Sequence, residues 1–239
     1  MRWLVATVAE TVPETERAVT LRLDVPGWPG HQAGQHVDVR LTAEDGYSAQ
    51  RSYSIASPPG AEPLELTVER IEDGEVSPYL TTVASPRDQF ELRGPIGGWF
   101  VWDGTETAPV LLVGGGSGVV PLRAILRHHA ASGSTAAMHL LYSASTLGDV
   151  IYRRELEALE GPRRAVTLTL TRETPPEWAG PRGRVDPGLL AETGWPPSVQ
   201  PRCYVCGPTA FVEAVADALV GLGHEPTLIR TERFGPTGG

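Results

Sequence analysis

The pattern of apolar residues changes once along this chain, after residue 107, and this change constrains the fold most. Before it, six short runs alternate or are rich in β-branched residues, and turns such as Asp45-Gly46 and Asp73-Gly74 separate them. The runs are residues 3–8, 18–25, 36–41, 51–56, 64–71 and 89–93. Six short strands with little helix are typical of a closed antiparallel β-barrel.

In the second half, apolar strands and amphipathic helices alternate, which predicts an α/β domain with a parallel sheet. The expected strands are residues 109–113, 138–143, 165–171, 202–206 and 227–231, and the expected helices are 119–131, 150–159 and 208–221. The polar stretch 103–107 is typical of a linker. We therefore expect two domains, an antiparallel β-barrel at residues 1–107 and a parallel-sheet α/β domain at 108–239.

Charge and hydrophobicity limit which partners the protein can bind and where it can be located. The net charge of −9 argues against nucleic acid, and no apolar run approaches the roughly 18 residues that span a bilayer. The N-terminus lacks the layout of a signal peptide, so we expect a cytoplasmic protein. The first 107 residues hold 17 acidic residues and 8 arginines, whereas the rest hold 12 of each. The second half is thus the better place for a polyanionic ligand.

The two cysteines, Cys203 and Cys206, have the C-x-x-C spacing of a redox pair or of half a zinc site. Both fall in a predicted strand, where residues three apart point to opposite faces. A second pair of ligands at zinc spacing is missing from the sequence. We expect neither a disulfide nor a metal site.

Three short motifs carry groups suited to ligand binding, and they occur in a fixed order. Arg51-Ser52-Tyr53-Ser54 places a cation, an aromatic ring and a hydroxyl on one strand. Gly114-Gly115-Gly116-Ser117-Gly118 joins a strand to a helix, where bare backbone can approach an anionic ligand closely. Cys206-Gly207-Pro208 ends another strand, at the carboxyl edge where α/β folds bind ligands. Taken singly, the motifs also fit an ordinary strand and two tight turns.

This ordered set resembles the ferredoxin–NADP reductase family of flavoenzymes over nearly the whole chain. The resemblance implies a flavin-dependent NAD(P)H oxidoreductase that passes hydride from NADPH to FAD N5 and then electrons to a separate acceptor, a ferredoxin-like or other redox protein. NADH is the possible alternative to NADPH. Two other functions stay open: a flavin reductase that acts directly on a small molecule, and a non-catalytic subunit that binds flavin or nucleotide and senses redox state.

The resemblance assigns the first motif to the flavin. Arg51 binds a flavin phosphate, Tyr53 stacks on or borders the isoalloxazine, and Ser54 forms a hydrogen bond near N5. The alternative interpretation is that Arg51 is an ordinary surface arginine and Tyr53 an ordinary strand tyrosine.

A second phosphate element is implied at Gly74, Val76 and Ser77. Here the residues themselves suggest the same chemistry, because a glycine turn leads into a helix with Ser77 as N-cap and Pro78 as its first residue. A plain N-cap without a ligand is the alternative. The two phosphate elements together favour FAD over FMN.

For the pyridine nucleotide, the resemblance identifies the glycine loop and the cysteine motif. The loop residues that match are Gly115, Gly116, Gly118 and Pro121. Cys206, Gly207 and Pro208 match the element beside the nicotinamide, so Cys206 is implied near C4. Cys203 matches nothing in the family and is expected in the core.

The 2′-phosphate of NADPH would need cationic partners. Thr171 and Arg172 align with a Ser-Arg pair of NADP-specific relatives, and Arg182 and Arg184 follow in a Pro/Gly-rich loop. Ser145 is less supportive, because relatives often have arginine at that position. The preference for NADPH rests on these residues, and a solvated loop is the alternative.

Near the C-terminus, Glu232 and Phe234 fit the family's arrangement of an acidic residue, a spacer and an aromatic ring that covers the flavin. Five residues follow Phe234, and a charged tail is the alternative. With Ser54 and Cys206, Glu232 completes the implied catalytic set. The sequence has no cysteine cluster for an iron–sulfur centre, so we expect a separate partner protein. The acidic first half favours a neutral or basic acceptor over an acidic ferredoxin.

Overall fold

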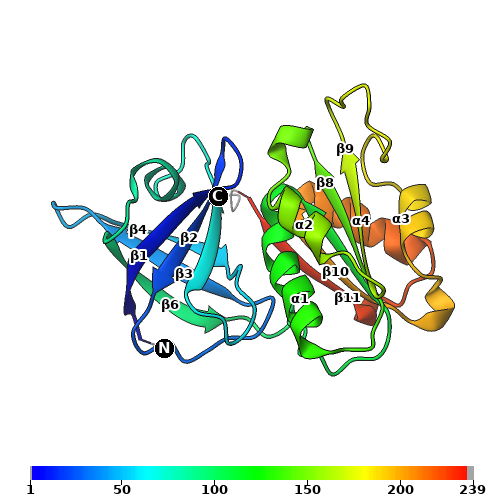
Figure 1. Cartoon of the computed structure of the whole chain (residues 1–239), viewed down its shortest axis with the longest axis horizontal. Coiled ribbons are helices and arrows are strands. Elements are labelled where there is room, and N and C mark those ends of the chain that lie inside the picture. The colour runs from blue at the N-terminus through cyan, green and yellow to red at the C-terminus, as the bar shows by residue number, and fades with distance from the viewer. Residues whose placement is uncertain (1, 236–239) are drawn as a thin grey trace. The chain divides into compact units, whose positions relative to one another are not determined.

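A computed structural model describes residues 2–235 of the chain. They divide between Trp102 and Asp103 into two compact units, which are described separately below (Figure 1). Among residues 2–235, none of the helices combines the length and the apolar character that a membrane span requires.

The first unit is an antiparallel six-stranded sheet with strand order β4-β3-β6-β1-β2-β5. Its strands are β1 (Leu4–Pro13), β2 (Ala18–Asp24), β3 (His36–Thr42), β4 (Ser48–Ser54), β5 (Leu64–Glu69) and β6 (Gln89–Ile96). Just beyond β4, a bridge between Ile55 and Leu66 and a hydrogen bond from the Ala56 N–H to the Glu65 carbonyl join the two edge strands. The predicted antiparallel barrel is confirmed, and it closes at this single point.

The barrel core follows from side-chain alternation along these strands. Val37 and Val39 of β3 are buried inside, together with Leu66 of β5 and Leu92 of β6. Asp38 lies on the other face of β3, where it accepts hydrogen bonds from Ser52 and Arg93. The outer face of the sheet is therefore polar although the inner face is apolar.

The predicted helix after β5 is wrong in one respect that matters for the site. The segment forms a single π-helical turn, η1 (Tyr79–Val83), with Pro78 at the N-cap and no side-chain cap. Ser77 does not cap it. The buried Ser77 hydroxyl instead accepts a hydrogen bond from the Ile71 N–H at 3.1 Å. One turn provides little helix dipole, so the capped-helix argument for phosphate binding no longer holds.

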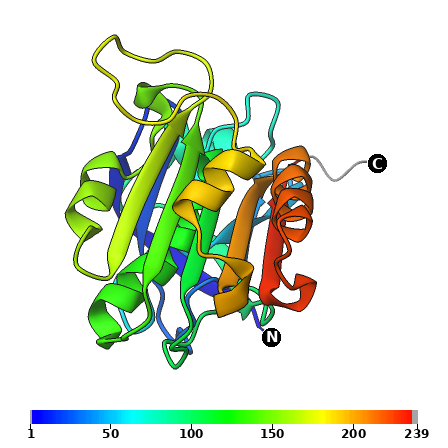
Figure 2. The same cartoon turned by 90° about the vertical axis from the view of Figure 1, so that its right-hand side faces the viewer.

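The second unit is a parallel five-stranded sheet in the order β11-β10-β7-β8-β9. Its strands are β7 (Val110–Gly115), β8 (Met138–Ala144), β9 (Arg164–Leu170), β10 (Arg202–Pro208) and β11 (Ile229–Phe234). Its helices are α1 (Val119–Ser132), α2 (Arg153–Leu159), α3 (Pro187–Thr193) and α4 (Thr209–Gly221). Figure 2 shows α3 and α4 together on one face of the sheet. The predicted parallel α/β architecture is confirmed, and its strand order reverses between β7 and β10, where such folds bind ligands.

Two helices differ from the sequence prediction. Helix α2 begins at Arg153 instead of residue 150, because Tyr152 adopts a left-handed conformation with φ of 60° and ends the preceding turn. Helix α3 is absent from the prediction, although its start has a clear signal. Asp186 caps it by accepting from the Leu189 N–H at 2.8 Å, and Pro187 occupies the first helical position.

The face of the sheet that α3 and α4 cover carries one hydrophobic core of this unit. Cys203 and Val205 of β10 pack there with Leu190 of α3 and Val212 of α4. Cys203 is thus a core residue, as expected, and both cysteines are buried free thiols. Residues 103–107, the predicted linker, fall within the second unit, where the Glu106 carboxylate pairs with Arg202 at 2.7 Å.

Candidate functional site

Arg51 and Tyr53 lie on the inward face of β4. In the β3–β4 register, Tyr53 is opposite Val37 and Arg51 is opposite Val39, both of which are core residues. Tyr53 is half-buried and packs on the core, and burial raises the pKa of its phenol, so the ring stays neutral. Arg51 is exposed, because at its level β4 has no partner strand on its second edge. The barrel thus presents a cation and an aromatic ring side by side.

Arg51 belongs to a small cluster that the sequence did not predict. Its Nη2 pairs with the Glu75 carboxylate, and its Nη1 donates to the Gln50 carbonyl at 2.6 Å. The Tyr47 hydroxyl donates to the other carboxylate oxygen of Glu75. These two hydrogen bonds lower the pKa of Glu75, and the one from Tyr47 has the larger effect. A carboxylate already lies against Arg51, so this guanidinium is positioned to hold an anion, as a flavin phosphate requires.

The turn at Gly74 brings Glu75 to this position. A Cβ at Gly74 would lie 2.9 Å from the Ser77 hydroxyl and 3.0 Å from the Ile71 carbonyl oxygen, so the turn leaves no room for a side chain. Val76 and Ser77 are buried, and their side chains face the protein. Any contact that this element makes with a phosphate therefore has to come from its backbone.

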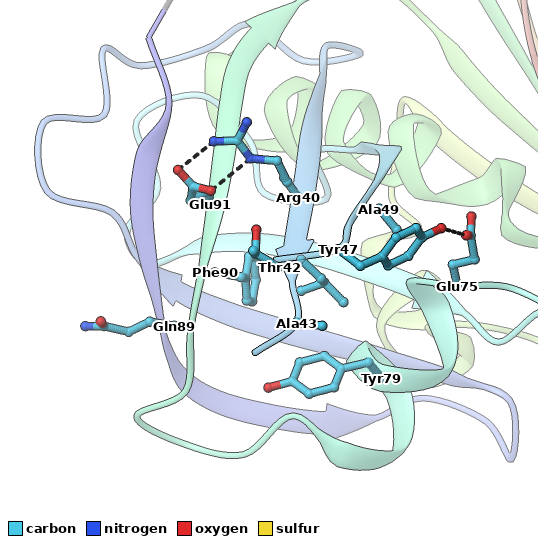
Figure 3. A pocket seen from close by; sticks show the side chains of 11 residues that line it. Arg40, Thr42, Ala43, Tyr47, Ala49, Glu75, Tyr79, Gln89, Phe90 and Glu91 are labelled. Carbon is cyan, nitrogen blue, oxygen red and sulfur yellow. Dashed lines mark hydrogen bonds and ion pairs between the residues drawn. The ribbon is translucent and has the colours of Figure 1, made fainter. Parts of the chain in front are cut away.

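A pocket of about 480 Å³ adjoins the cluster (Figure 3). Tyr47 and Glu75 belong to its wall, and Figure 3 shows the Tyr47 hydroxyl pointing toward Glu75, with Tyr79 of η1 below them in this view. The full lining is Arg40, Leu41, Thr42, Ala43, Tyr47, Ala49, Glu75, Tyr79, Gln89, Phe90 and Glu91. Aromatic walls with a polar rim suit a flat, partly polar ligand group.

Ser54 is the last residue of β4 and lies opposite His36 in the β3–β4 register. Ser54 and the His36 imidazole beside it are both half-buried, and partial burial lowers the pKa of His36. The sequence did not indicate His36. The structure therefore places a hydroxyl next to a neutral imidazole at the end of the strand that carries Arg51 and Tyr53.

In the second unit, the glycine loop packs directly on the cysteine motif. A Cβ at Gly118 would lie 2.1 Å from the Cys206 carbonyl oxygen, which leaves no room for any side chain. Gly115 and Gly207 are both covered by the ring of Phe211, at 2.9 and 2.7 Å from their would-be Cβ atoms. Gly116 adopts φ of 55°, a left-handed conformation that glycine favours. The run is thus required for packing at the point where the strand order reverses.

Cys206, Gly114 and Glu232 lie side by side across three strands. Cys206 of β10 is the register partner of Gly114 on β7 and of Glu232 on β11. Cys206 is buried, and burial together with the nearby Glu232 charge raises its pKa, so the group is a thiol at neutral pH. Burial raises the pKa of Glu232 to about 7. A carboxyl group with this pKa can hold or release a proton under ordinary conditions.

Pro208 and Phe234 form the last register pair, two residues further on, at the ends of β10 and β11. Glu232 and Phe234 therefore belong to a strand, not to a charged tail, and Phe234 is half-buried. Pro121 is buried in the first turn of α1, behind the glycine loop. These positions bring together the cysteine motif, the glycine loop and the acidic residue that the sequence separates widely.

The three arginines assigned to the 2′-phosphate, Arg172, Arg182 and Arg184, lie beyond the end of β9. The N–H groups of Thr171 and Arg172 donate to the carbonyls of Ala144 and Ser145, at 3.0 and 2.9 Å, which fixes them beside the end of β8. The loop then folds around Trp178, whose indole donates to the Pro181 carbonyl. Figure 2 shows this yellow-green loop extending from the sheet.

The side chains of these three arginines are accessible to a ligand. Arg172, Arg182 and Arg184 are all exposed, and the Arg182 guanidinium donates to the Trp178 carbonyl at 3.1 Å. Exposed guanidinium groups around one loop fit a phosphomonoester chemically. The donor set therefore suits a 2′-phosphate.

Comparison with known proteins agrees with this arrangement. Residues 6–101 match the family model of the oxidoreductase FAD-binding domain, and residues 112–217 match that of the oxidoreductase NAD-binding domain. A ferredoxin–NADP reductase B from Sorangium cellulosum is 36% identical over 85% of each chain. A glycine betaine monooxygenase reductase subunit from Chromohalobacter salexigens is 32% identical, with 85% of this chain aligned to 56% of that one.

The fold is shared with solved structures. The flavohaem-like FAD/NAD-binding domain of a nitric oxide dioxygenase from Vibrio cholerae has a TM-score of 0.87 at 25% identity, covering 98% of this chain and 99% of that one. Domain matches, relatives and fold all agree with the motifs that the sequence carries in order. The chain therefore belongs to the ferredoxin–NADP reductase family of FAD-containing, NAD(P)H-dependent oxidoreductases.

Proposed function

We propose that this chain takes reducing equivalents from NADPH and passes electrons to a separate redox protein. The observation that carries the proposal is the contact between the glycine loop and the cysteine motif, with Glu232 in register beside Cys206. This arrangement supplies a close backbone approach, a small neutral thiol and a titratable acid at the carboxyl edge of the sheet. When bound, FAD accepts hydride and can release electrons one at a time.

The barrel residues bind and orient the flavin in this proposal. Arg51 holds a phosphate through charge-assisted hydrogen bonds, with the Gly74–Ser77 backbone as a second contact. Tyr53 borders the ring system with a neutral, half-buried phenol. Ser54 donates or accepts a hydrogen bond at the edge of the ring where the hydride arrives.

The residues of the second unit bind the nucleotide. The glycine loop at Gly115–Gly118 and the start of the Pro208 turn accommodate the dinucleotide backbone, and Cys206 lies beside the nicotinamide. Thr171, Arg172, Arg182 and Arg184 bind the 2′-phosphate, which selects NADPH over NADH. Glu232, with its pKa near 7, holds or supplies a proton close to the reacting atoms.

The acceptor is proposed to be a protein with a neutral or basic docking face. Two observations support it. The relatives named above are a ferredoxin–NADP reductase and the reductase subunit of a monooxygenase, both named for protein partners. The first 107 residues hold more than twice as many acidic residues as arginines, which disfavours an acidic partner. A cytoplasmic location is part of the same proposal.

Anaerobic reduction followed by an acceptor screen tests this function. Purified protein should be yellow, NADPH should bleach it within seconds, and NADH should do so more slowly. The reduced protein should then reduce cytochrome c, a one-electron protein acceptor, faster than it reduces free flavin or a quinone. Efficient turnover of a small molecule together with failure on protein acceptors would favour a flavin reductase instead.

A further inference from the structure

Glu75 places an anion where the proposed function places a flavin phosphate. Its carboxylate lies against Arg51, the side chain that the proposed function assigns to a flavin phosphate. We propose that Glu75 is a built-in competitor of that phosphate: it holds Arg51 when the cofactor is absent and opposes phosphate binding when the cofactor arrives. This inference rests on the proposed role of Arg51.

The geometry allows Arg51 to exchange one anion for the other. The pair is solvent-facing, with Arg51 53% and Glu75 43% exposed, and exposed ion pairs are weak enough to break readily. The bond to Gln50 uses a different guanidinium nitrogen and fixes the side chain independently of Glu75. Arg51 can therefore keep its position while its anionic partner changes.

Glu75 stays close by after it releases Arg51. Tyr47 donates to one carboxylate oxygen and Arg51 to the other, so the Arg51 contact can break while the Tyr47 contact remains. Tyr47 and Glu75 both line the pocket in Figure 3. The tight turn at Gly74 limits how far the Glu75 backbone can shift.

A carboxylate held this close repels an incoming phosphate. The repulsion acts on the charged part of the cofactor and leaves the flavin ring untouched. Ligands that share the ring and differ in phosphate therefore separate the two contributions: FAD carries a pyrophosphate, FMN a single phosphate and riboflavin none. Competition by Glu75 predicts an effect on FAD and FMN and none on riboflavin.

The test compares Glu75→Gln with the unaltered chain. Flavin is stripped from both proteins, and each is titrated with FAD, FMN and riboflavin while flavin fluorescence is followed. The substitution keeps the shape and removes the charge, so the Kd for FAD and FMN should fall roughly five- to tenfold. Glu10→Gln serves as the matched control, because Glu10 is an exposed barrel carboxylate paired with Arg22 at 2.6 Å and away from this cluster.

Three results would overturn the inference. The Kd for FAD could stay unchanged or rise in Glu75→Gln, riboflavin could tighten as much as FAD does, or the Glu10 control could show the same gain. Glu75→Ala, checked by thermal melting, distinguishes a folding defect from a charge effect, because both variants should tighten FAD binding. Failure of the unaltered chain to bind any flavin would instead remove the proposed function, and the inference with it.

Discussion

The candidate ligand sites of the two units are built from different kinds of groups. In the barrel, the candidate phosphate site consists of exposed charges, Arg51 and Glu75, held by side-chain hydrogen bonds. In the α/β unit, the candidate nucleotide site consists of buried backbone, where Gly118 touches Cys206 and Phe211 covers Gly115. Exposed charges can be tuned by one substitution or by salt, whereas close-packed backbone tolerates almost no change. The predictions below test this contrast, in order of decreasing effect.

The largest effect is expected from Gly118→Ala. The added Cβ would meet the Cys206 carbonyl oxygen at 2.1 Å, and a backbone atom cannot move aside cheaply. We expect a loss of at least about 3 kcal/mol in unfolding free energy, measured by thermal or denaturant unfolding. Gly221→Ala is the control, because nothing lies within 4 Å of the Cβ built at that position. Equal stability of the two variants would show that the loop can relax.

Arg51→Gln should act on the cofactor and spare the fold. Removal of the exposed cation should weaken FAD binding roughly 10- to 100-fold, because a charge-assisted hydrogen bond to phosphate is lost. Flavin fluorescence titration measures this, and the melting temperature of the flavin-free protein should change little. Riboflavin affinity should be the same as in the unaltered chain, and a parallel loss for riboflavin would place Arg51 at the ring.

Glu232 should give the α/β unit a pH-dependent stability. Burial raises its pKa from 4.5 to about 7, so the folded state binds the proton more tightly than the unfolded chain does. The contribution of Glu232 to the free energy of unfolding is therefore most favourable below pH 4.5. It is lost as the pH rises to about 7. Glu232→Gln should remove that loss and gain roughly 2 kcal/mol relative to the unaltered chain at pH 8, with little difference near pH 4.5.

Unfolding midpoints across this pH range measure the Glu232 effect, and identical pH profiles for the two proteins would contradict it. In the proposed reaction, the same substitution should also flatten the pH dependence of flavin reduction around pH 7. Glu225→Gln, an exposed carboxylate of the same unit, is the matched control and should leave both profiles unchanged.

The smallest effect is expected in the arginine loop. Arg172→Ala should raise the KM for NADPH about tenfold and leave the KM for NADH unchanged, because only NADPH carries the 2′-phosphate. Steady-state kinetics with both coenzymes measures the ratio. Arg153→Ala, which removes an exposed arginine paired with Glu157 on α2, controls for a general change of charge. Equal effects on both coenzymes would argue against the phosphate assignment for Arg172.

The sequence predicts the fold well where the pattern is local. Alternation along β1–β6 and apolar runs along β7–β11 identify both sheets, and the order of the Arg51, Gly114 and Cys206 motifs identifies the family. The domain boundary and the roles of the individual site residues stay predictions. The prediction that Ser77 is an N-cap is wrong. A serine before a proline is typical of a helix start, but the Ser77 hydroxyl instead accepts a hydrogen bond from the Ile71 N–H.

The candidate site contains residues that no local pattern could reveal. Glu75 meets Arg51 and Tyr47 across 24 and 28 residues of sequence. In the sequence, Phe211 is simply an apolar residue of a predicted helix, yet its ring covers two glycines at the ends of different strands. Such contacts depend on the order of the strands in the sheet, and no single segment of the sequence predicts that order.

The arginine side chains of the loop that follows β9 are exposed, and their exposure affects how coenzyme preference can change. Trp178 and the Arg182–Trp178 hydrogen bond fold the loop on itself, and its arginines point into solvent. Exchanges at Arg172 or Arg184 therefore leave the sheet and the glycine contacts intact. In the proposed function, substitutions in this loop can therefore change the preference between the two nicotinamide coenzymes, by natural drift or by design, whereas the packed glycine loop has no room for such substitutions.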